Sequence, residues 1–236
     1  MNTMITAVRL RFAACLILFI ALSLPAADNP RLVERLAAGK PQVVVAYGTS
    51  LTHMGAWVQM LDQELQARFP GLVRVVNGAQ SAKWSTWGVQ HLDERVLSRK
   101  PDTVFIEFAI NDAYLPYKTT VPTARKNLET MIDRILAAKA DTEIILMTMN
   151  PPTAVHLEQR PGIEQYIAMY RAVAAERKLQ LIDQYPHWQR ILAEDPERFR
   201  RLVPDGIHPA AAGSAEVTMP LLRAALGLAD GAPAGK

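Results

Sequence analysis

The sequence predicts a three-layer α/β domain built on a parallel sheet, and three observations lead to this prediction. Five short apolar runs have the length of strands, amphipathic segments with helical spacing separate them, and the two types alternate along the chain. Nearly continuous apolar runs are typical of parallel strands covered on both faces. A repeating strand–helix order places the helices in right-handed crossovers on both sides of such a sheet.

The predicted strands are nearly continuous apolar runs. They cover residues 42–47, 72–76, 103–108, 143–149 and 179–183. Between and after them, apolar side chains recur every three or four positions, the spacing of a helix with one buried face. These helical patterns cover residues 57–65, 89–96, 128–136, 167–174 and 219–226. No internal repeat or linker interrupts this order, which indicates one domain.

The first 27 residues have the layout of a secretory signal peptide. Arg9 and Arg11 precede an apolar run over residues 12–24, and small residues follow it. We therefore expect export to the periplasm or the extracellular space. The alternative is an uncleaved segment that anchors the protein to a membrane. The expected organisation is a signal peptide over 1–27, a domain over 28–228 and a disordered tail over 229–236.

Composition and charge exclude several classes of function. Of the 236 residues, 50% are hydrophobic and 21% are charged, which suits one globular domain with a full core. The net charge is +3, and it falls to +1 without residues 1–27, because 24 basic and 23 acidic side chains remain. A basic run with interleaved aromatic residues would indicate a nucleic-acid partner, and the sequence has none. The single cysteine, Cys15, lies in the signal segment, so the mature chain has no disulfide, thiol nucleophile or cysteine-based zinc site.

Polar residues cluster where the predicted strands end. The carboxyl ends of parallel strands meet at one edge of the sheet, where open α/β sheets bind their ligands. The segments that follow the first four strands at this edge are residues 48–52, 77–85, 109–112 and 150–152. Residues 204–209, before the last helix, can close over the same edge. We expect the functional site where these five segments converge.

Ser50, His208 and Asp205 have the residue types of a nucleophile, its base and the group that orients the base. A serine on a tight turn between strand and helix is held out at the edge of the sheet, beside free N–H groups of the helix. Histidine is the usual base for a serine, and an acceptor on its second ring nitrogen fixes its tautomer. The three-residue spacing can place the Asp205 carboxylate beside the His208 ring. The alternatives are a helix N-cap for Ser50 and a surface turn for 204–209.

Acyl transfer by a serine also needs hydrogen-bond donors for the oxyanion of the tetrahedral intermediate. The backbone N–H groups of Ser50 and Ala82 can supply two donors, and the side chain of Asn111 can supply a third. The alternative for Asn111 is a turn residue that bonds to its own backbone. Gly78 or Ser81 can replace Ala82 if the pattern is shifted along the chain.

Together these segments resemble the SGNH/GDSL hydrolase family. The matching blocks are Gly48 to Leu51, then Asn77 with Ala82, then 109–112, and last 205–208, in the family's order over about residues 42–226. The resemblance implies a flavodoxin-like parallel five-stranded sheet of order 2-1-3-4-5 and a Ser-His-Asp hydrolase. By it Ser50 is the nucleophile and first oxyanion donor, Asn111 is a side-chain donor, His208 is the base and Asp205 orients the base.

The chain departs from the family pattern at three positions. Thr49 replaces the Asp of the Gly-Asp-Ser signature, a residue that is not part of the family's triad. Ala82 replaces the oxyanion glycine of the second block, and its Cβ restricts the backbone if φ must be positive. Ala109 replaces the glycine of the third block, beside an intact Asn111.

Aromatic residues flank the second and third blocks. Trp84, Trp87, Tyr114 and Tyr117 are candidates for a platform under a sugar ring or an apolar acyl chain, and ordinary core packing is the alternative. Asp112 can bind substrate or fix the Asn111 loop. The remaining histidines have no metal-ligand spacing; they are His53, His91, His156 and His187.

The leading hypothesis is therefore an exported serine ester hydrolase that needs no metal or organic cofactor. We expect an O-acetyl group on carbohydrate, or another short acyl ester, as substrate; a lysophospholipid, a thioester or acyl transfer to an alcohol are alternatives with the same residues. A second hypothesis is a carbohydrate-binding module that keeps the scaffold without turnover. A third is a phosphate or flavin site at residues 48–52, which leaves Asp205 and His208 unexplained. The sequence predicts no oligomeric state.

Overall fold

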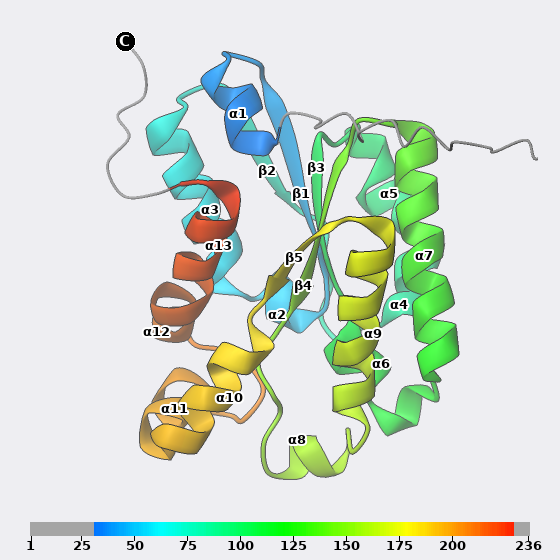
Figure 1. Ribbon diagram of the computed structural model, residues 1–236, viewed down its shortest axis with the longest axis vertical. Helices are drawn as coiled ribbons and strands as arrows, with labels where there is room; N and C mark the ends of the chain where they lie inside the picture. The colour runs from blue at the N-terminus through cyan, green and yellow to red at the C-terminus, as the bar shows by residue number, and fades with distance from the viewer. Residues whose placement is uncertain (1–30, 229–236) are drawn as a thin grey trace, which may run out of the picture.

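A computed structural model describes residues 31–228 as three layers with a parallel sheet in the middle (Figure 1). The sheet has the order β2-β1-β3-β4-β5, and all of its neighbours are parallel. Its strands are β1 (Gln42–Gly48), β2 (Val73–Asn77), β3 (Thr103–Glu107), β4 (Glu143–Thr148) and β5 (Gln180–Asp183). The predicted fold class and strand order are confirmed. The predicted signal segment 1–27 and tail 229–236 lie outside the described residues.

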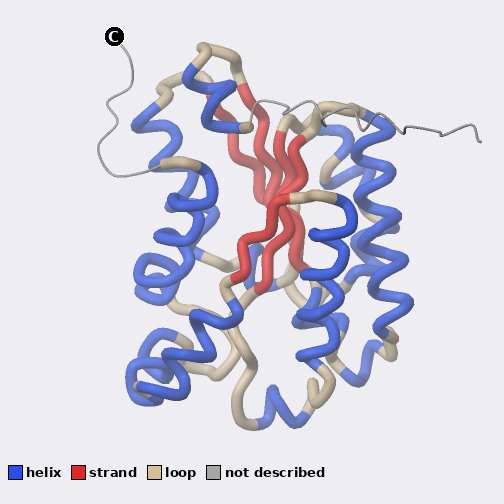
Figure 2. The backbone as a smooth tube through the Cα atoms, viewed as in Figure 1, coloured by secondary structure: helices blue, strands red, loops and turns tan. Residues whose placement is uncertain are grey.

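Helices cover both faces of the sheet, as the tube in Figure 2 also shows. One face carries α1 (Leu32–Ala37), α3 (Ala56–Arg68), α12 (Ala211–Gly213) and α13 (Met219–Leu226), with a π-helical turn η3 (Ser214–Thr218) between the last two. The other face carries α4 (Ser85–Gln90), α5 (Leu92–Arg95), α7 (Val121–Ala138) and α9 (Ile163–Arg177). The single helical pattern predicted for 89–96 is divided at His91 into α4 and α5, and a 3₁₀ turn η1 (Leu97–Arg99) follows.

The core sits between the sheet and these helices. The three inner strands are almost completely buried, as their continuous apolar runs predict; β3 is buried at all five positions. Large side chains fill the space between the layers, among them Trp57 and Phe105, which meet edge to face at 5.8 Å. This packing fixes the strand ends from which the site residues project.

Two helices after β5 were not predicted from the sequence. They are α10 (Tyr185–Glu194) and α11 (Pro196–Leu202), and they enclose a second apolar cluster around Trp188 and Phe199. The start of α11 had a usable signal, because Asp195 caps it with its side chain and Pro196 occupies its first turn.

Short helical turns occupy the carboxyl edge of the sheet. These are α2 (Ser50–His53), α6 (Ala109–Asp112), the 3₁₀ turn η2 (Leu115–Tyr117) and α8 (Val155–Glu158). They follow β1, β3 and β4, so the chain returns to this edge three times with polar residues. The segment after α11 comes back to the same edge before α12.

Candidate active site

Ser50 stands at the first position of α2, directly beyond the end of β1. The cap of this helix is Thr49, whose hydroxyl accepts a hydrogen bond from the Leu51 N–H at 3.2 Å. The alternative in which Ser50 itself caps the helix is therefore wrong. Because Thr49 satisfies the helix end, the half-buried Ser50 hydroxyl is free to bond outside its own turn.

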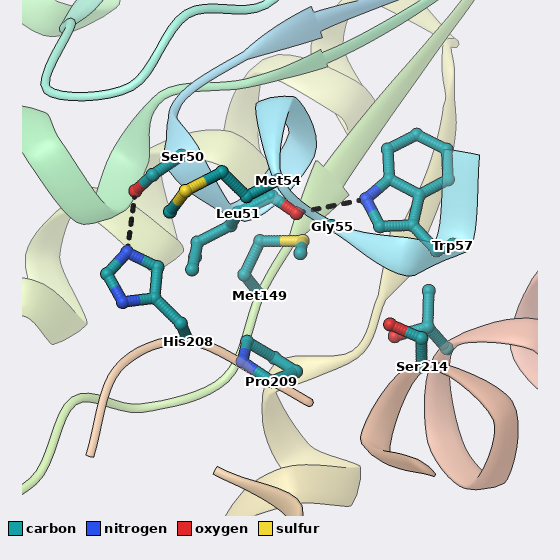
Figure 3. A pocket seen from close by; sticks show the side chains of 10 residues that line it. Ser50, Leu51, Met54, Gly55, Trp57, Met149, His208, Pro209 and Ser214 are labelled. Atoms are coloured by element: carbon teal, nitrogen blue, oxygen red, sulfur yellow. Dashed lines mark hydrogen bonds between the residues drawn. The ribbon is translucent and has the colours of Figure 1, made fainter. Parts of the chain in front are cut away.

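The side chains of Ser50, His208 and Asp205 form one chain of hydrogen bonds. His208 Nε2 lies 2.8 Å from Ser50 Oγ, and His208 Nδ1 lies 2.6 Å from Asp205 Oδ2. Figure 3 shows the His208 ring turned toward the Ser50 hydroxyl. These distances fit a ring that donates from Nδ1 to the carboxylate and accepts the serine proton at Nε2. The structure thus brings together residues 158 positions apart in the sequence.

Asp205 is fixed by its own loop as well as by the imidazole. Its Oδ1 accepts hydrogen bonds from the backbone N–H groups of Ile207, at 3.0 Å, and His208, at 2.7 Å. Burial raises the pKa of Asp205, but the hydrogen bonds from His208 and Ile207 outweigh it and lower the pKa to about 2. The group is therefore an ionised acceptor for the His208 ring over the whole neutral range.

The loop that carries Asp205 and His208 is anchored to the segment that follows β4. Gly206 has a φ of 83°, a value that favours glycine, and its carbonyl accepts a hydrogen bond from the Thr153 N–H at 2.8 Å. The buried side chain of Asn150 donates to the Ile207 carbonyl at 3.0 Å. Sequence reasoning placed 150–152 at this edge without assigning Asn150 a contact.

The segment predicted to supply a second oxyanion donor is held at two successive carbonyls. Ala82 has a φ of 56°, the conformation in which its Cβ is a disadvantage. Its carbonyl accepts a hydrogen bond from the Tyr117 hydroxyl at 2.9 Å, and the next carbonyl, of Lys83, accepts one from Asn111 Nδ2 at 2.9 Å. An amide nitrogen carries two hydrogens, so Asn111 keeps a second N–H for another acceptor.

Arg160 approaches Asn111 from the opposite side, a contact that sequence reasoning missed. Its Nη2 lies 3.5 Å from Asn111 Oδ1, and its Nε donates to the Ile110 carbonyl at 2.7 Å. The guanidinium also lies over the Tyr114 ring, 4.6 Å from its centre. A donor on Oδ1 fixes the orientation of the amide and directs Nδ2 away from Arg160. The isolated position of Arg160 in the sequence gives no sign of this role.

The predicted substrate-contacting residues fall into two groups. Trp84 and Tyr114 are half-buried at the edge of the site; Trp84 stacks on Tyr117 with ring centres 4.3 Å apart, and Tyr114 meets Tyr117 edge to face. Trp87, by contrast, is 6% exposed and packs against His91, so the expectation that it contacts substrate is corrected: it belongs to the core.

Asp112 is likewise a buried support and not a surface group. It is 1% exposed, and its Oδ1 accepts a hydrogen bond from the Ser85 N–H at 2.9 Å. Burial raises the pKa of Asp112 to about 7, although the bonds from Ser85 act in the opposite direction. The carboxyl group therefore joins α6 to α4 and fixes the Asn111 loop, the second of the two roles considered for it.

A narrow cavity opens beside the Ser50 and His208 side chains. Figure 3 shows Leu51, Met54, Met149 and Pro209 around it. The cavity measures about 20 Å³, while about 10–15 Å³ is enough for one water molecule, so it can take a group of about methyl size. Its walls are mostly apolar, which favours a short hydrocarbon part of a ligand.

Between residues 31 and 228, no group of three or more His, Cys, Asp or Glu side chains is arranged to hold a metal ion. His53, which had no predicted role, bonds through Nδ1 to Ser81 Oγ at 3.0 Å. In the same part of the chain, no helix combines the length and the apolar character that crossing a membrane requires.

Fold and site together place a Ser–His–Asp hydrogen-bond chain at the carboxyl edge of a parallel α/β sheet. The chain belongs to the GDSL-like lipase/acylhydrolase family, which its sequence matches over residues 27–215. It is therefore a hydrolase that acts on ester bonds, and the resemblance found in its sequence motifs is confirmed. Among curated proteins, none matches the chain significantly.

Several solved structures are similar to this chain over most of its length. A lipase/acylhydrolase from Enterococcus faecalis is 27% identical, with a TM-score of 0.66, and the match covers 79% of this chain and 96% of that one. An α/β hydrolase from the metagenome of Lake Arreo, Spain, is 25% identical, with a TM-score of 0.67 and coverage of 80% and 96%. An acetylxylan esterase from Geobacillus stearothermophilus is 22% identical, with a TM-score of 0.69 and coverage of 80% and 95%. The last of these shows likeness of fold alone.

Proposed function

We propose that Ser50, His208 and Asp205 are the catalytic triad of this ester hydrolase. The observation that carries the proposal is the continuous hydrogen-bond chain from Ser50 Oγ through the His208 ring to Asp205. Ser50 attacks the acyl carbon as His208 Nε2 takes the hydroxyl proton, and the same proton passes to the departing alkoxide as the ester C–O bond breaks. Water then attacks the acyl-enzyme, gives its proton to His208, and the proton returns to Ser50 as the carboxylic acid leaves.

Three hydrogen-bond donors are proposed for the developing oxyanion. The N–H of Ser50 lies in the first turn of α2, where helix N–H groups have no acceptor within the helix. The N–H of Ala82 and the second N–H of Asn111 complete the set, and the contacts from Tyr117 and Arg160 hold both in place. Fixed donors of this kind stabilise the tetrahedral intermediate without reorganisation.

Covalent labelling of Ser50 tests the triad directly. A fluorophosphonate should phosphonylate the wild-type protein at Ser50, with peptide mapping to locate the adduct, and Ser50→Ala should not react. Ser81→Ala is the matched control, because Ser81 is also near the site but bonds to His53 instead of His208. Labelling of Ser50→Ala equal to wild type, or hydrolysis of p-nitrophenyl acetate by that variant, would contradict the assignment.

We further propose an O-acetyl group on carbohydrate as the substrate. The narrow apolar cavity beside Ser50 suits an acetyl methyl group, and the stacked Trp84–Tyr117 pair offers an aromatic surface for a sugar ring. Likeness of fold to an acetylxylan esterase supports the same choice. The test is release of acetate from acetylated xylan and acetylated glucan, compared with p-nitrophenyl esters from acetyl to palmitoyl.

Four exposed apolar side chains favour a second candidate, an ester with a longer acyl chain such as a lysophospholipid. Met54, Leu115, Val155 and Leu157 are 46–61% exposed, and all follow the carboxyl ends of strands. Exposed apolar side chains on the segments that follow strand ends can contact an apolar part of a ligand. A rise in kcat/KM with acyl length would favour this candidate, and a fall beyond acetyl or propionyl would favour the acetyl ester.

We also propose that the enzyme is exported. The proposal rests on Arg9, Arg11 and the apolar run over residues 12–24, the pattern of a signal peptide. N-terminal sequencing of the protein recovered from a periplasmic or culture fraction should begin near residue 28. Recovery of the intact chain in the cytoplasmic fraction would contradict export.

A further inference from the structure

Glu107 is a buried carboxyl group directly beneath the turn that carries Ser50. It is the last residue of β3, it pairs in register with Gly48 at the end of β1, and it is 2% exposed. An acidic residue at the end of a fully buried strand has a high desolvation cost, so its position needs a physical reason. The proposed catalytic steps do not use it.

The hydrogen bonds of the Glu107 side chain all go to residues of the turn that carries Ser50. Its Oε1 accepts hydrogen bonds from the Thr49 N–H at 2.6 Å and from the Thr52 hydroxyl at 2.7 Å. The Thr49 hydroxyl donates between both carboxylate oxygens, at 3.0 and 3.1 Å. One side chain thus fixes the residue before Ser50 and the residue two positions after it.

Gly48 shows how closely this carboxylate approaches the backbone. A Cβ at position 48 would lie 2.2 Å from Glu107 Oε1 and 2.4 Å from the Glu107 carbonyl oxygen. No side chain could be accommodated at that distance without a shift of β1 or β3. The glycine at the start of the signature is therefore needed for the approach of Glu107 and not for a positive φ.

We propose that Glu107 is a positioning residue for Ser50, and that Thr49 is the hydroxyl donor this carboxylate requires where the family signature has an Asp. The inference rests on the proposed role of Ser50 as nucleophile. Glu107 holds both ends of the first turn of α2, and this fixes the direction of Ser50 Oγ toward His208 Nε2. Thr49 completes the arrangement by donating to Glu107 while it caps α2.

Threonine at position 49 supplies a donor to Glu107 without placing a second acid beside it. An aspartate would place a carboxylate within hydrogen-bond distance of Glu107 in a site without solvent, and two carboxylates at that distance cannot both ionise. Burial already raises the pKa of Glu107 to about 7, with the threonine hydrogen bonds opposing the shift and the nearby Asp112 adding to it. Threonine supplies a donor without a second charge.

A set of variants tests the coupling between positions 49 and 107. Glu107→Gln keeps an acceptor for the threonine donors, so kcat should remain within about tenfold of wild type. Thr49→Asp should lower kcat at least about 100-fold with KM nearly unchanged, because the altered turn misplaces Ser50 while the substrate surface is intact. In the combined variant Thr49→Asp/Glu107→Gln the amide can donate to the new carboxylate, so kcat should recover at least about tenfold over Thr49→Asp alone.

A milder variant covers the case in which Thr49→Asp does not fold. Thr49→Val removes only the hydroxyl and should lower kcat about tenfold without a change in KM. Thr142→Val is the matched control: its buried hydroxyl makes a bond of 3.0 Å to the Pro101 carbonyl at the opposite edge of the sheet, and its kcat should equal wild type. A wild-type kcat for Thr49→Val, or strictly additive effects in the combined variant, would overturn the inference.

The rate of fluorophosphonate labelling at Ser50 separates this inference from the proposed function. If wild-type Ser50 does not label, the proposed function fails. If wild-type Ser50 labels and the folded Thr49 variants label at the same rate, the triad stands and the role of Glu107 as a positioning residue fails.

Discussion

Replacement of Asp112 by asparagine should stabilise the protein at alkaline pH and leave its stability almost unchanged at acidic pH. Asp112 is buried at 1% exposure, and its Oδ1 accepts a bond from the Ser85 N–H that an asparagine oxygen can also accept. The two side chains have nearly the same shape. The variant therefore removes the titration of the buried carboxyl group and little else.

The magnitude follows from the pKa of Asp112, which burial raises from 3.8 to about 7. Below pH 3.8 the group is protonated in both the folded and the unfolded chain, so it costs nothing. As the pH rises, the unfolded chain releases the proton first, and the free energy of unfolding falls until the pH passes about 7. A difference of about three pH units corresponds to about 4 kcal/mol, which Asp112→Asn should restore at pH 8.

Urea denaturation followed by circular dichroism at pH 4 and pH 8 measures this effect. The advantage of Asp112→Asn over wild type should grow by about 4 kcal/mol between the two pH values. Asp141→Asn is the control for the loss of one carboxyl group, because Asp141 is an exposed aspartate. An equal pH dependence for wild type and Asp112→Asn would refute the reasoning from burial.

Three further variants address the proposed chemistry. His208→Ala should lower kcat by at least about 10⁴-fold with little change in the melting temperature, because the imidazole is half-exposed; an equal loss of stability would make it a structural residue. Asn111→Ala should lower kcat by about 100- to 1,000-fold and raise KM much less, and the reverse pattern would indicate substrate binding. Tyr117→Phe removes the bond to the Ala82 carbonyl and should lower kcat several-fold, about the effect of one hydrogen bond, with hydrolysis of p-nitrophenyl acetate as the assay. An unchanged kcat for Tyr117→Phe would mean that Ala82 holds its conformation without it.

The sheet could be predicted from the sequence because its three inner strands are buried on both faces. Each predicted strand agrees with the structure to within about one residue at either end, since apolar runs end where the chain leaves the core. The break at His91 could not be predicted in this way, because the apolar spacing continues unchanged across it. Helices α10 and α11 were not predicted, and they bury apolar side chains in a separate small cluster.

The meeting of Ser50 with His208 could be predicted because strand ends in a parallel sheet converge at one edge. The supporting residues could not, because their roles depend on side chains from distant segments. Arg160 reaches Asn111 from the loop before α9, and no spacing in the sequence connects the two. The sequence shows Glu107 as an acid at the end of an apolar strand, which is an unusual position. It shows Thr49 only as a departure from the family signature, and not as the partner of Glu107.

The arrangement of Asp205 and His208 on one short loop has a mechanical consequence. The Asp205 carboxylate accepts hydrogen bonds from the His208 ring and from two backbone N–H groups of the same loop, so this loop orients its own base. The Thr153 N–H and the Asn150 side chain anchor the same loop from the segment after β4, so neither the acid nor its anchors depend on Ser50. A change of side chain at position 50 should therefore leave the base with its tautomer and its charge partner.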